Sequence, residues 1–112
     1  MRRVIGGTWV TDLTHFIDDT RGLHHLLTGP GRNLALHMTA IVAAATTMLA
    51  RGPAQHVRCR RRPNRRLCMG TIEHRLWPDE RITWDCPVCG DNGVISNWQS
   101  TAWDMRPARP VH

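Results

Sequence analysis

The fold is decided by residues 84–98, which read Trp-Asp-Cys-Pro-Val-Cys-Gly-Asp-Asn-Gly-Val-Ile-Ser-Asn-Trp. Cys86 and Cys89 are separated by two residues, a spacing at which two thiolates converge on one metal ion. Gly90 accepts the positive φ that a turn behind the second cysteine requires. Asp91-Asn92-Gly93 then turns the chain back into a strand. The stretch therefore predicts a metal-binding knuckle between two strands.

The Cys-x-x-Cys spacing also serves thiol redox chemistry, which is the first alternative. A redox-active pair gains its lowered thiol pKa largely from the N-terminus of a helix. Here Cys86 ends a predicted strand, and no helix is predicted after Cys89. The pattern therefore favours metal binding.

Two further cysteines, Cys59 and Cys68, complete a C-x8-C-x17-C-x2-C pattern. If Pro63-Asn64 is the centre of a two-residue turn, Cys59 falls directly opposite Cys68 on one face of a hairpin. Opposed Cβ atoms lie ~4.5 to 5.5 Å apart, and two thiolates on one tetrahedral zinc need sulfur atoms just under ~4 Å apart. We therefore predict one structural zinc ion held by all four cysteines.

Three alternatives stand beside this site. A disulfide could join Cys59 to Cys68, although no secretion signal precedes them. His56 or His74 could replace one cysteine ligand, and His74 is more simply a partly buried residue facing Trp84. Iron could replace zinc in a site of four thiolates.

The segments around the second knuckle have the pattern of short, half-buried strands, which we expect at residues 70–76, 82–86 and 93–98. A three-residue loop, Pro78-Asp79-Glu80, puts the apolar partners of the first two strands on one face. The facing pairs are then Leu76 and Ile82, His74 and Trp84, and Ile72 and Cys86.

The N-terminal half predicts one long amphipathic helix, at about residues 32–50. Gly29-Pro30-Gly31 marks its beginning and Gly52-Pro53 its end. Apolar residues recur with helical spacing at Leu34, Met38, Ile41, Val42, Ala45, Met48 and Leu49. Before the helix we expect a short strand near residues 3–10 and one helical turn after Asp12.

Residues 56–104 resemble a zinc ribbon. The stretch 84–98, with the later Trp103-Asp104, is similar to small bacterial zinc-ribbon proteins of uncharacterised function. Zinc ribbons occur in transcription and translation factors, ribosomal proteins, nucleic-acid enzymes and interaction modules. The resemblance therefore implies a fold and a metal more than an activity.

Together these features predict an α+β protein in which an N-terminal helical segment, residues 1–55, packs on a C-terminal three-stranded antiparallel zinc ribbon, residues 56–104. Residues 105–112 form a short tail. The chain has 112 residues, so a single hydrophobic core is small and needs a further source of stability, such as a bound metal ion. Zinc binding supplies that stability in the ribbon.

The charge of the chain is concentrated in one place. All fifteen basic residues are arginine and the formal net charge is +6. The 16 residues from Arg51 to Arg66 contain seven arginines and no acidic residue. Such a field attracts polyanions or acidic protein surfaces. We expect contact with nucleic acid, with an acidic protein partner or a solvated patch as alternatives; the predicted contact residues are Arg58, Arg60, Arg61, Arg62, Arg65 and Arg66.

A second class of function is a protein-interaction adaptor, which could act as a homodimer. It would use the long helix and the region of Trp98 and Trp103. Large aromatic side chains are more often buried in a domain of this size, so we favour packing of both tryptophans in the core.

Catalysis is not expected. The candidate acid-base residues match no known signature such as H-E-x-x-H, and neither a Gly-rich phosphate loop nor a nucleophile elbow is present. These candidates are His15, Asp18, Asp19, His24, His25 and His37.

We expect no membrane span, because residues 34–50 contain His37 and several threonines and fall short of the ~20 apolar residues that a span needs. The chain shows no targeting segment, which predicts a cytoplasmic protein.

Overall fold

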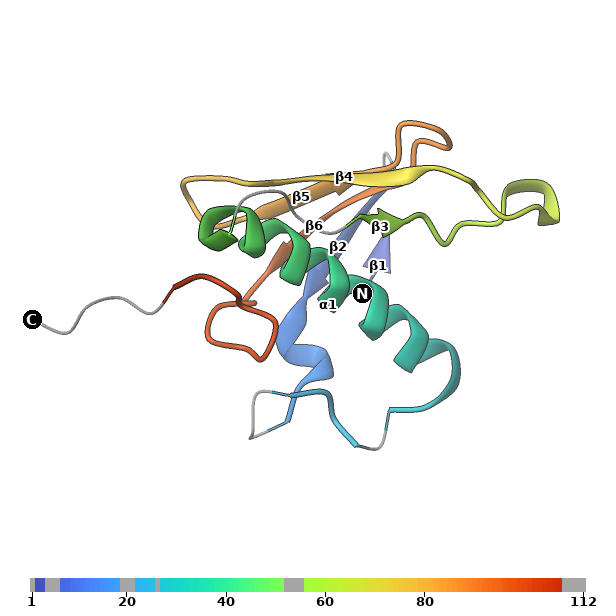
Figure 1. Cartoon of the computed structure of the whole chain (residues 1–112). Coiled ribbons are helices and arrows are strands. Elements are labelled where there is room, and N and C mark those ends of the chain that lie inside the picture. Colours follow the sequence, from blue (N-terminus) through green and yellow to red (C-terminus); the bar gives the residue numbers. More distant parts are fainter. Residues whose placement is uncertain (1, 4–6, 19–21, 26, 52–55, 108–112) are drawn as a thin grey trace, which may run out of the picture.

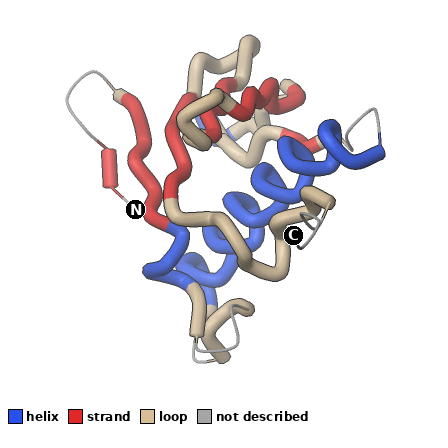
Figure 2. The backbone as a smooth tube through the Cα atoms, turned by 90° about the vertical axis from the view of Figure 1, so that its left-hand side faces the viewer, coloured by secondary structure: helices blue, strands red, loops and turns tan. Residues whose placement is uncertain are grey.

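The computed structural model describes residues 2–3, 7–18, 22–25, 27–51 and 56–107. In these residues a six-stranded mixed sheet has the order β1-β2-β6-β5-β4-β3, and one long helix packs on it (Figures 1 and 2). The strands are β1 (Arg2–Arg3), β2 (Thr8–Asp12), β3 (Val57–Arg58), β4 (Thr71–Leu76), β5 (Ile82–Asp85) and β6 (Asn92–Ser96). The helices are α1 (Gly29–Arg51) and the short 3-10 turns η1 (Leu13–Phe16) and η2 (Pro63–Arg65).

Helix α1 confirms the helical periodicity of the sequence. Its inward face buries Met38, Ile41, Val42 and Ala45 against the sheet, and Leu34 packs at the edge of the same cluster. The side chains of Met48 and Leu49 lie outside the described part of the structure. No described helix is long and apolar enough to cross a membrane.

The hairpin of β4 and β5 has the predicted register. Leu76 pairs with Ile82 and His74 pairs with Trp84. The loop closes through the Trp77 N–H, which donates to the Arg81 carbonyl at 2.9 Å. Along these strands buried residues alternate with exposed ones, so only one face of the hairpin contributes to the core.

Strand β6 contains a glycine because an indole lies against it. Gly93 pairs with Trp84 across the antiparallel ladder. A Cβ atom on Gly93 would lie 2.7 Å from ring atoms of Trp84. The missing side chain therefore makes room for Trp84, which is almost fully buried.

The sheet has more strands than predicted, six instead of three. β2 pairs in parallel with β6, from Thr8 opposite Asn92 to Asp12 opposite Ser96, and β1 pairs with β2. β3 adds at the opposite edge, beside β4. A three-stranded ribbon would leave the polar backbone groups of β6 unpaired at an edge, and β2 satisfies them.

The prediction of an N-terminal helical segment is also wrong, because two strands precede α1. The expected strand near residues 3–10 corresponds to β1 and β2, and the expected helical turn corresponds to η1. The Asp12 carboxylate begins that turn by accepting a hydrogen bond from the Thr14 N–H at 3.0 Å.

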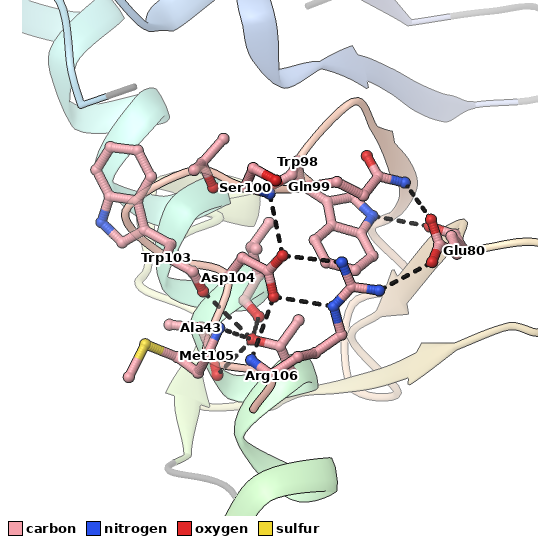
Figure 3. Close-up of polar contacts among 12 residues, drawn as sticks. Ala43, Glu80, Trp98, Gln99, Ser100, Trp103, Asp104, Met105 and Arg106 are labelled. Carbon is pink, nitrogen blue, oxygen red and sulfur yellow. Dashed lines mark hydrogen bonds and ion pairs between the residues drawn. The ribbon is translucent and has the colours of Figure 1, made fainter. Parts of the chain in front are cut away.

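The segment after β6 folds back onto the core (Figure 3). Trp98 is fully buried, as expected, and its indole N–H donates to the Glu80 carbonyl at 2.8 Å. Arg106 lies over the Trp98 ring at 4.5 Å and forms ion pairs of 2.9 Å with both Glu80 and Asp104. Trp103 packs partly buried against the core. Burial of Trp98 removes it from the recognition surface that the adaptor hypothesis needed.

Candidate metal centre

Four cysteine sulfur atoms converge at one end of the sheet. The Sγ atoms of Cys59, Cys68, Cys86 and Cys89 all lie within 4.8 Å of one another. Two of the pairs, Cys59 with Cys89 and Cys68 with Cys86, are separated by 3.6 Å. Sulfur atoms bonded at ~2.3 Å to one tetrahedral ion lie just under ~4 Å apart. The cluster could therefore hold a metal ion.

The order of the strands brings these residues together. Cys59 follows β3 and Cys68 precedes β4, whereas Cys86 follows β5 and Cys89 precedes β6. Because β4 and β5 are neighbours in the sheet, the two loops lie at the same end of it. Cys59, Cys68 and Cys86 are buried and Cys89 is partly buried.

The first loop is wider than the sequence predicted. Arg58 pairs with Thr71, and the Cys59 N–H donates to the Gly70 carbonyl at 3.0 Å. Cys59 therefore lies opposite Gly70, so its predicted position directly opposite Cys68 is wrong.

The turn chemistry explains this change of register. The Cys68 N–H donates to the Arg61 carbonyl at 2.8 Å, which closes a loop longer than two residues. Within that loop Asn64 and Arg65 have φ values of 55° and 65°, in the left-handed region. The predicted two-residue turn at Pro63-Asn64 does form, because the Arg65 N–H donates to the Arg62 carbonyl at 3.1 Å; the change of register arises after it, between Arg65 and Cys68.

Backbone N–H groups surround the sulfur atoms. The Arg61 N–H lies 3.5 Å from Cys59 Sγ, and the Gly70 N–H lies 3.4 Å from Cys68 Sγ. In both cases the donor follows the cysteine by two residues, so the chain curls around each sulfur atom. Such donors stabilise a thiolate more than a thiol.

The second loop curls in the predicted way. The Gly90 N–H donates to the Cys86 carbonyl at 2.8 Å, and Gly90 has a φ of 80°. The positive φ expected behind Cys89 is therefore present.

Two of the four thiols hold their protons more tightly than an ordinary cysteine does. Burial raises the pKa of the Cys59 thiol to about 12. The Gly70 N–H acts to lower the pKa of Cys68, but burial and the Cys86 thiol outweigh it, so this pKa is raised as well. Burial acts to raise the pKa of Cys86, but the N–H groups of Cys89 and Val88 lower it overall. Binding of a metal ion must therefore displace protons from buried thiols.

The alternatives to a four-cysteine site receive no support. All four cysteines are free thiols, so Cys59 and Cys68 form no disulfide. Among the described residues the four cysteines are the one cluster of three or more potential metal ligands. His56 is exposed, and His74 lies opposite Trp84 in the sheet.

The predicted arginines gather beside this centre. Residues 60–66, here called the arginine loop, join the two cysteines of the first knuckle and project beyond the end of the sheet (Figure 1). Arg61 forms an ion pair of 3.3 Å with Asp91 of the second knuckle, and Arg60 donates to the Asn33 carbonyl of α1. All six predicted contact residues, Arg58, Arg60, Arg61, Arg62, Arg65 and Arg66, are exposed.

The candidate acid-base residues do not form a common site. His24 and His25 stack on each other with ring centroids 4.9 Å apart, and His15 is exposed on η1. His37 lies on the inner side of α1, edge-on to Trp84 at 6.0 Å. Asp18 is partly buried, and Asp19 lies outside the described residues.

Two residues next to the metal centre carry no signal in the sequence pattern. Asp91 accepts hydrogen bonds from Arg61 and from the indole N–H of Trp9, the latter at 3.1 Å. Trp9 reaches this position through the parallel pairing of β2 with β6, which joins residues far apart in the chain.

Comparison with family models, with curated proteins and with solved structures finds no match for this chain.

Proposed function

We propose that the chain is a zinc-stabilised module, built like a zinc ribbon at residues 56–104, that binds the sugar–phosphate backbone of nucleic acids through the arginine loop. The observation that carries this proposal is the direct attachment of an exposed arginine loop to the metal knuckle. Cys59 directly precedes the loop and Cys68 follows it after Leu67, so a bound ion would fix both of its ends.

Zinc is the ion that best suits the donor set. Four thiolates form a closed tetrahedral site with no open position for substrate, which is typical of structural zinc. Iron accepts the same geometry, so elemental analysis of the purified protein tests this part of the proposal.

The arginines suit phosphate because the guanidinium group binds it with two parallel hydrogen bonds. In the described part of the structure Arg62, Arg65 and Arg66 have no ion-pair partner, and they are exposed at the tip of the loop. Their charges are therefore free to replace the counterions of a nucleic acid.

The proposal is tested by changing Arg62, Arg65 and Arg66 together to Gln. A matched control changes three exposed arginines elsewhere, Arg32, Arg75 and Arg81, so the net charge falls equally. The loop variant should weaken binding to single-stranded oligonucleotides. It should also flatten the dependence of log K on log salt by about 0.7 for each phosphate that the variant no longer neutralises.

The proposed mode of binding is wrong if both triple variants reduce affinity and salt dependence to the same extent. It is also wrong if the wild-type protein binds no oligonucleotide at low salt.

A second candidate function is binding of a protein partner, which three exposed apolar residues around the knuckles favour. Leu67 and Met69 flank Cys68, and Val88 lies between Cys86 and Cys89. Met69 and Val88 are 70% and 69% exposed. Met69→Ser with Val88→Ser would weaken a protein complex and leave binding to phosphates unchanged.

A further inference from the structure

A cavity of about 410 Å³ lies between the first turns of α1 and the metal end of the sheet. Its volume is in the range of pockets that hold small organic ligands. Its lining comes from five parts of the chain, which are β2, α1, the arginine loop, β5 and the second knuckle. The lining residues include Trp9, His37, Arg60, Arg61, Trp84 and Asp91.

The walls of the cavity offer flat and apolar surfaces. The partly exposed Trp9 contributes an indole ring and Leu34 an aliphatic group from α1, whereas Trp84 and Met38 reach the cavity with small parts only, being 2% and 1% exposed. Aromatic walls of this kind hold planar ring systems by stacking and by edge-to-face contact.

Polar groups in the cavity are held in place. The Asp91 carboxylate accepts hydrogen bonds from Trp9 at 3.1 Å and Arg61 at 3.3 Å. His37 is fixed against Trp84 and is neutral at physiological pH, because burial and the nearby Arg60 lower its pKa to about 4. A neutral imidazole offers one donor and one acceptor, as the hydrogen-bonding edge of a heterocycle requires.

The cavity and the arginine loop are continuous. Arg60 and Arg61 line the cavity, and they are also the first two residues of the loop. A ligand that fills the cavity with a planar ring would therefore have cationic side chains beside it. A nucleotide has this combination of a flat heterocycle and an adjacent phosphate.

We infer that the cavity takes one unstacked base of a single-stranded nucleic acid whose neighbouring phosphates lie on the arginine loop. This inference rests on the proposed function and adds to it a preference for single-stranded over double-stranded nucleic acid. A base inside a duplex is stacked and paired on both sides, so it cannot enter without the energetic cost of extrusion. A protein that contacts only the sugar–phosphate backbone does not distinguish single-stranded from double-stranded nucleic acid in this way.

The first experiment compares two single strands of equal length, an oligothymidylate and an abasic strand with the same phosphates. Their affinities for the metal-loaded protein are measured by fluorescence anisotropy. Stacking of a base on an aromatic side chain increases affinity by about 5- to 150-fold. We therefore expect the oligothymidylate to bind more tightly than the abasic strand by a factor in this range.

The second experiment fills the cavity. Asn33→Trp places a large side chain at an exposed lining position, and the Asn33 main-chain carbonyl that accepts from Arg60 is retained. The matched control, Leu36→Trp, lies on the outer face of the same helix, where Leu36 is 44% exposed. Asn33→Trp should reduce the affinity for oligothymidylate to that of the abasic strand, and Leu36→Trp should not.

A third measurement uses the wild-type protein and depends on no variant. The indole N–H resonances of Trp9 and Trp84 should shift on addition of oligothymidylate and not on addition of the abasic strand. The indole of Trp77, which lies beside Arg75 and Arg81 away from the cavity lining, serves as the internal reference.

The outcomes separate the two proposals. Equal affinity for both strands, with unchanged Trp9 and Trp84 resonances, would overturn the base site and leave binding through the arginine loop standing. If neither strand binds at low salt, the proposed function fails and the base site fails with it.

Discussion

The Sγ atom of Cys86 lies 2.5 Å from the position that a Cβ atom on Gly70 would occupy. The backbone of the first knuckle therefore packs directly against a sulfur atom of the second. The same Cβ would also lie 3.0 Å from Cβ of Val88. Gly70 thus determines how closely the two halves of the metal centre approach each other.

Replacing Gly70 by Ala should push the two knuckles apart. Overpacking at a buried site costs about 1–3 kcal/mol, and here it also displaces a metal ligand. We expect weaker metal binding and a lower melting temperature, measured by competition with a chelator and by thermal unfolding. Gly31→Ala is the control, because a Cβ there meets no atom within 4 Å. A Gly70→Ala protein with unchanged metal affinity would contradict the close approach.

Removal of one sulfur ligand should destabilise the metal end of the sheet. In Cys86→Ser the ion loses one of four thiolates, so most of the binding free energy that stabilises this end is removed. Chelation of the wild-type protein should have the same effect, followed by circular dichroism and native mass spectrometry. Val88→Ser in the same knuckle is the control, since Val88 is exposed and is not a ligand. If Cys86→Ser melts like the wild type, the metal is not structural.

The hydroxyl of Thr46 attaches the C-terminal segment to α1. It lies 3.2 Å from the Trp103 carbonyl, and the Met105 N–H donates to it at 2.9 Å. Thr46→Val keeps the shape and leaves these backbone groups without their partner, which should lower the free energy of unfolding by about 1–3 kcal/mol. Urea denaturation measures this change.

The control for that substitution is Thr47→Val, one residue further along α1. The Thr47 hydroxyl donates to the Ala43 carbonyl of its own helix. We expect a smaller loss of stability for Thr47→Val, and equal losses in the two variants would refute the role of Thr46 as an attachment point.

Stability should depend on the protonation of His37. In the folded protein its pKa is lowered to about 4 from the ordinary 6.5, mainly by burial and also by Arg60, with Asp91 acting in the opposite direction. As the pH falls from about 6.5 to about 4, the unfolded chain takes up a proton that the folded chain does not. The free energy of unfolding should therefore fall over this range.

This prediction is checked by urea denaturation at several pH values. His37→Gln should show a flatter pH dependence between about 6.5 and about 4, whereas His25→Gln, which replaces an exposed histidine, should follow the wild type. A wild-type curve without slope in this window would contradict the burial of a neutral His37.

Local patterns predicted the parts of the fold whose partners are close in sequence. The hairpin from Thr71 to Asp85 was predictable because one loop length places all its apolar residues on the same face. Helix α1 was predictable because its apolar residues repeat with helical spacing. In both cases the physical constraint acts over a few residues.

The remaining parts depend on contacts between distant segments. Nothing local to Thr8–Asp12 indicates that it pairs with β6, since a short strand of this composition suits many partners. The register at Cys59 was mispredicted although the Pro63-Asn64 turn forms, because the chain after Arg65, whose φ is positive, takes two more residues to return than a regular hairpin does. Convergence of the four cysteines was nevertheless predictable, because the spacing of the second pair indicates metal binding on its own.

The parallel pairing of β2 with β6 has a consequence for how the chain is made. Thr8 and Asn92, which face each other at one end of this pair, are 84 residues apart. Contacts of such long range form slowly, because a large loop must close before they are made. During synthesis β2 leaves the ribosome long before β6. Both cysteine knuckles precede β6 in the sequence, so both are synthesised before β2 can pair with β6. The pairing of β2 with β6 is therefore among the last in the sheet to form, whereas β1 and β2 can pair with each other early.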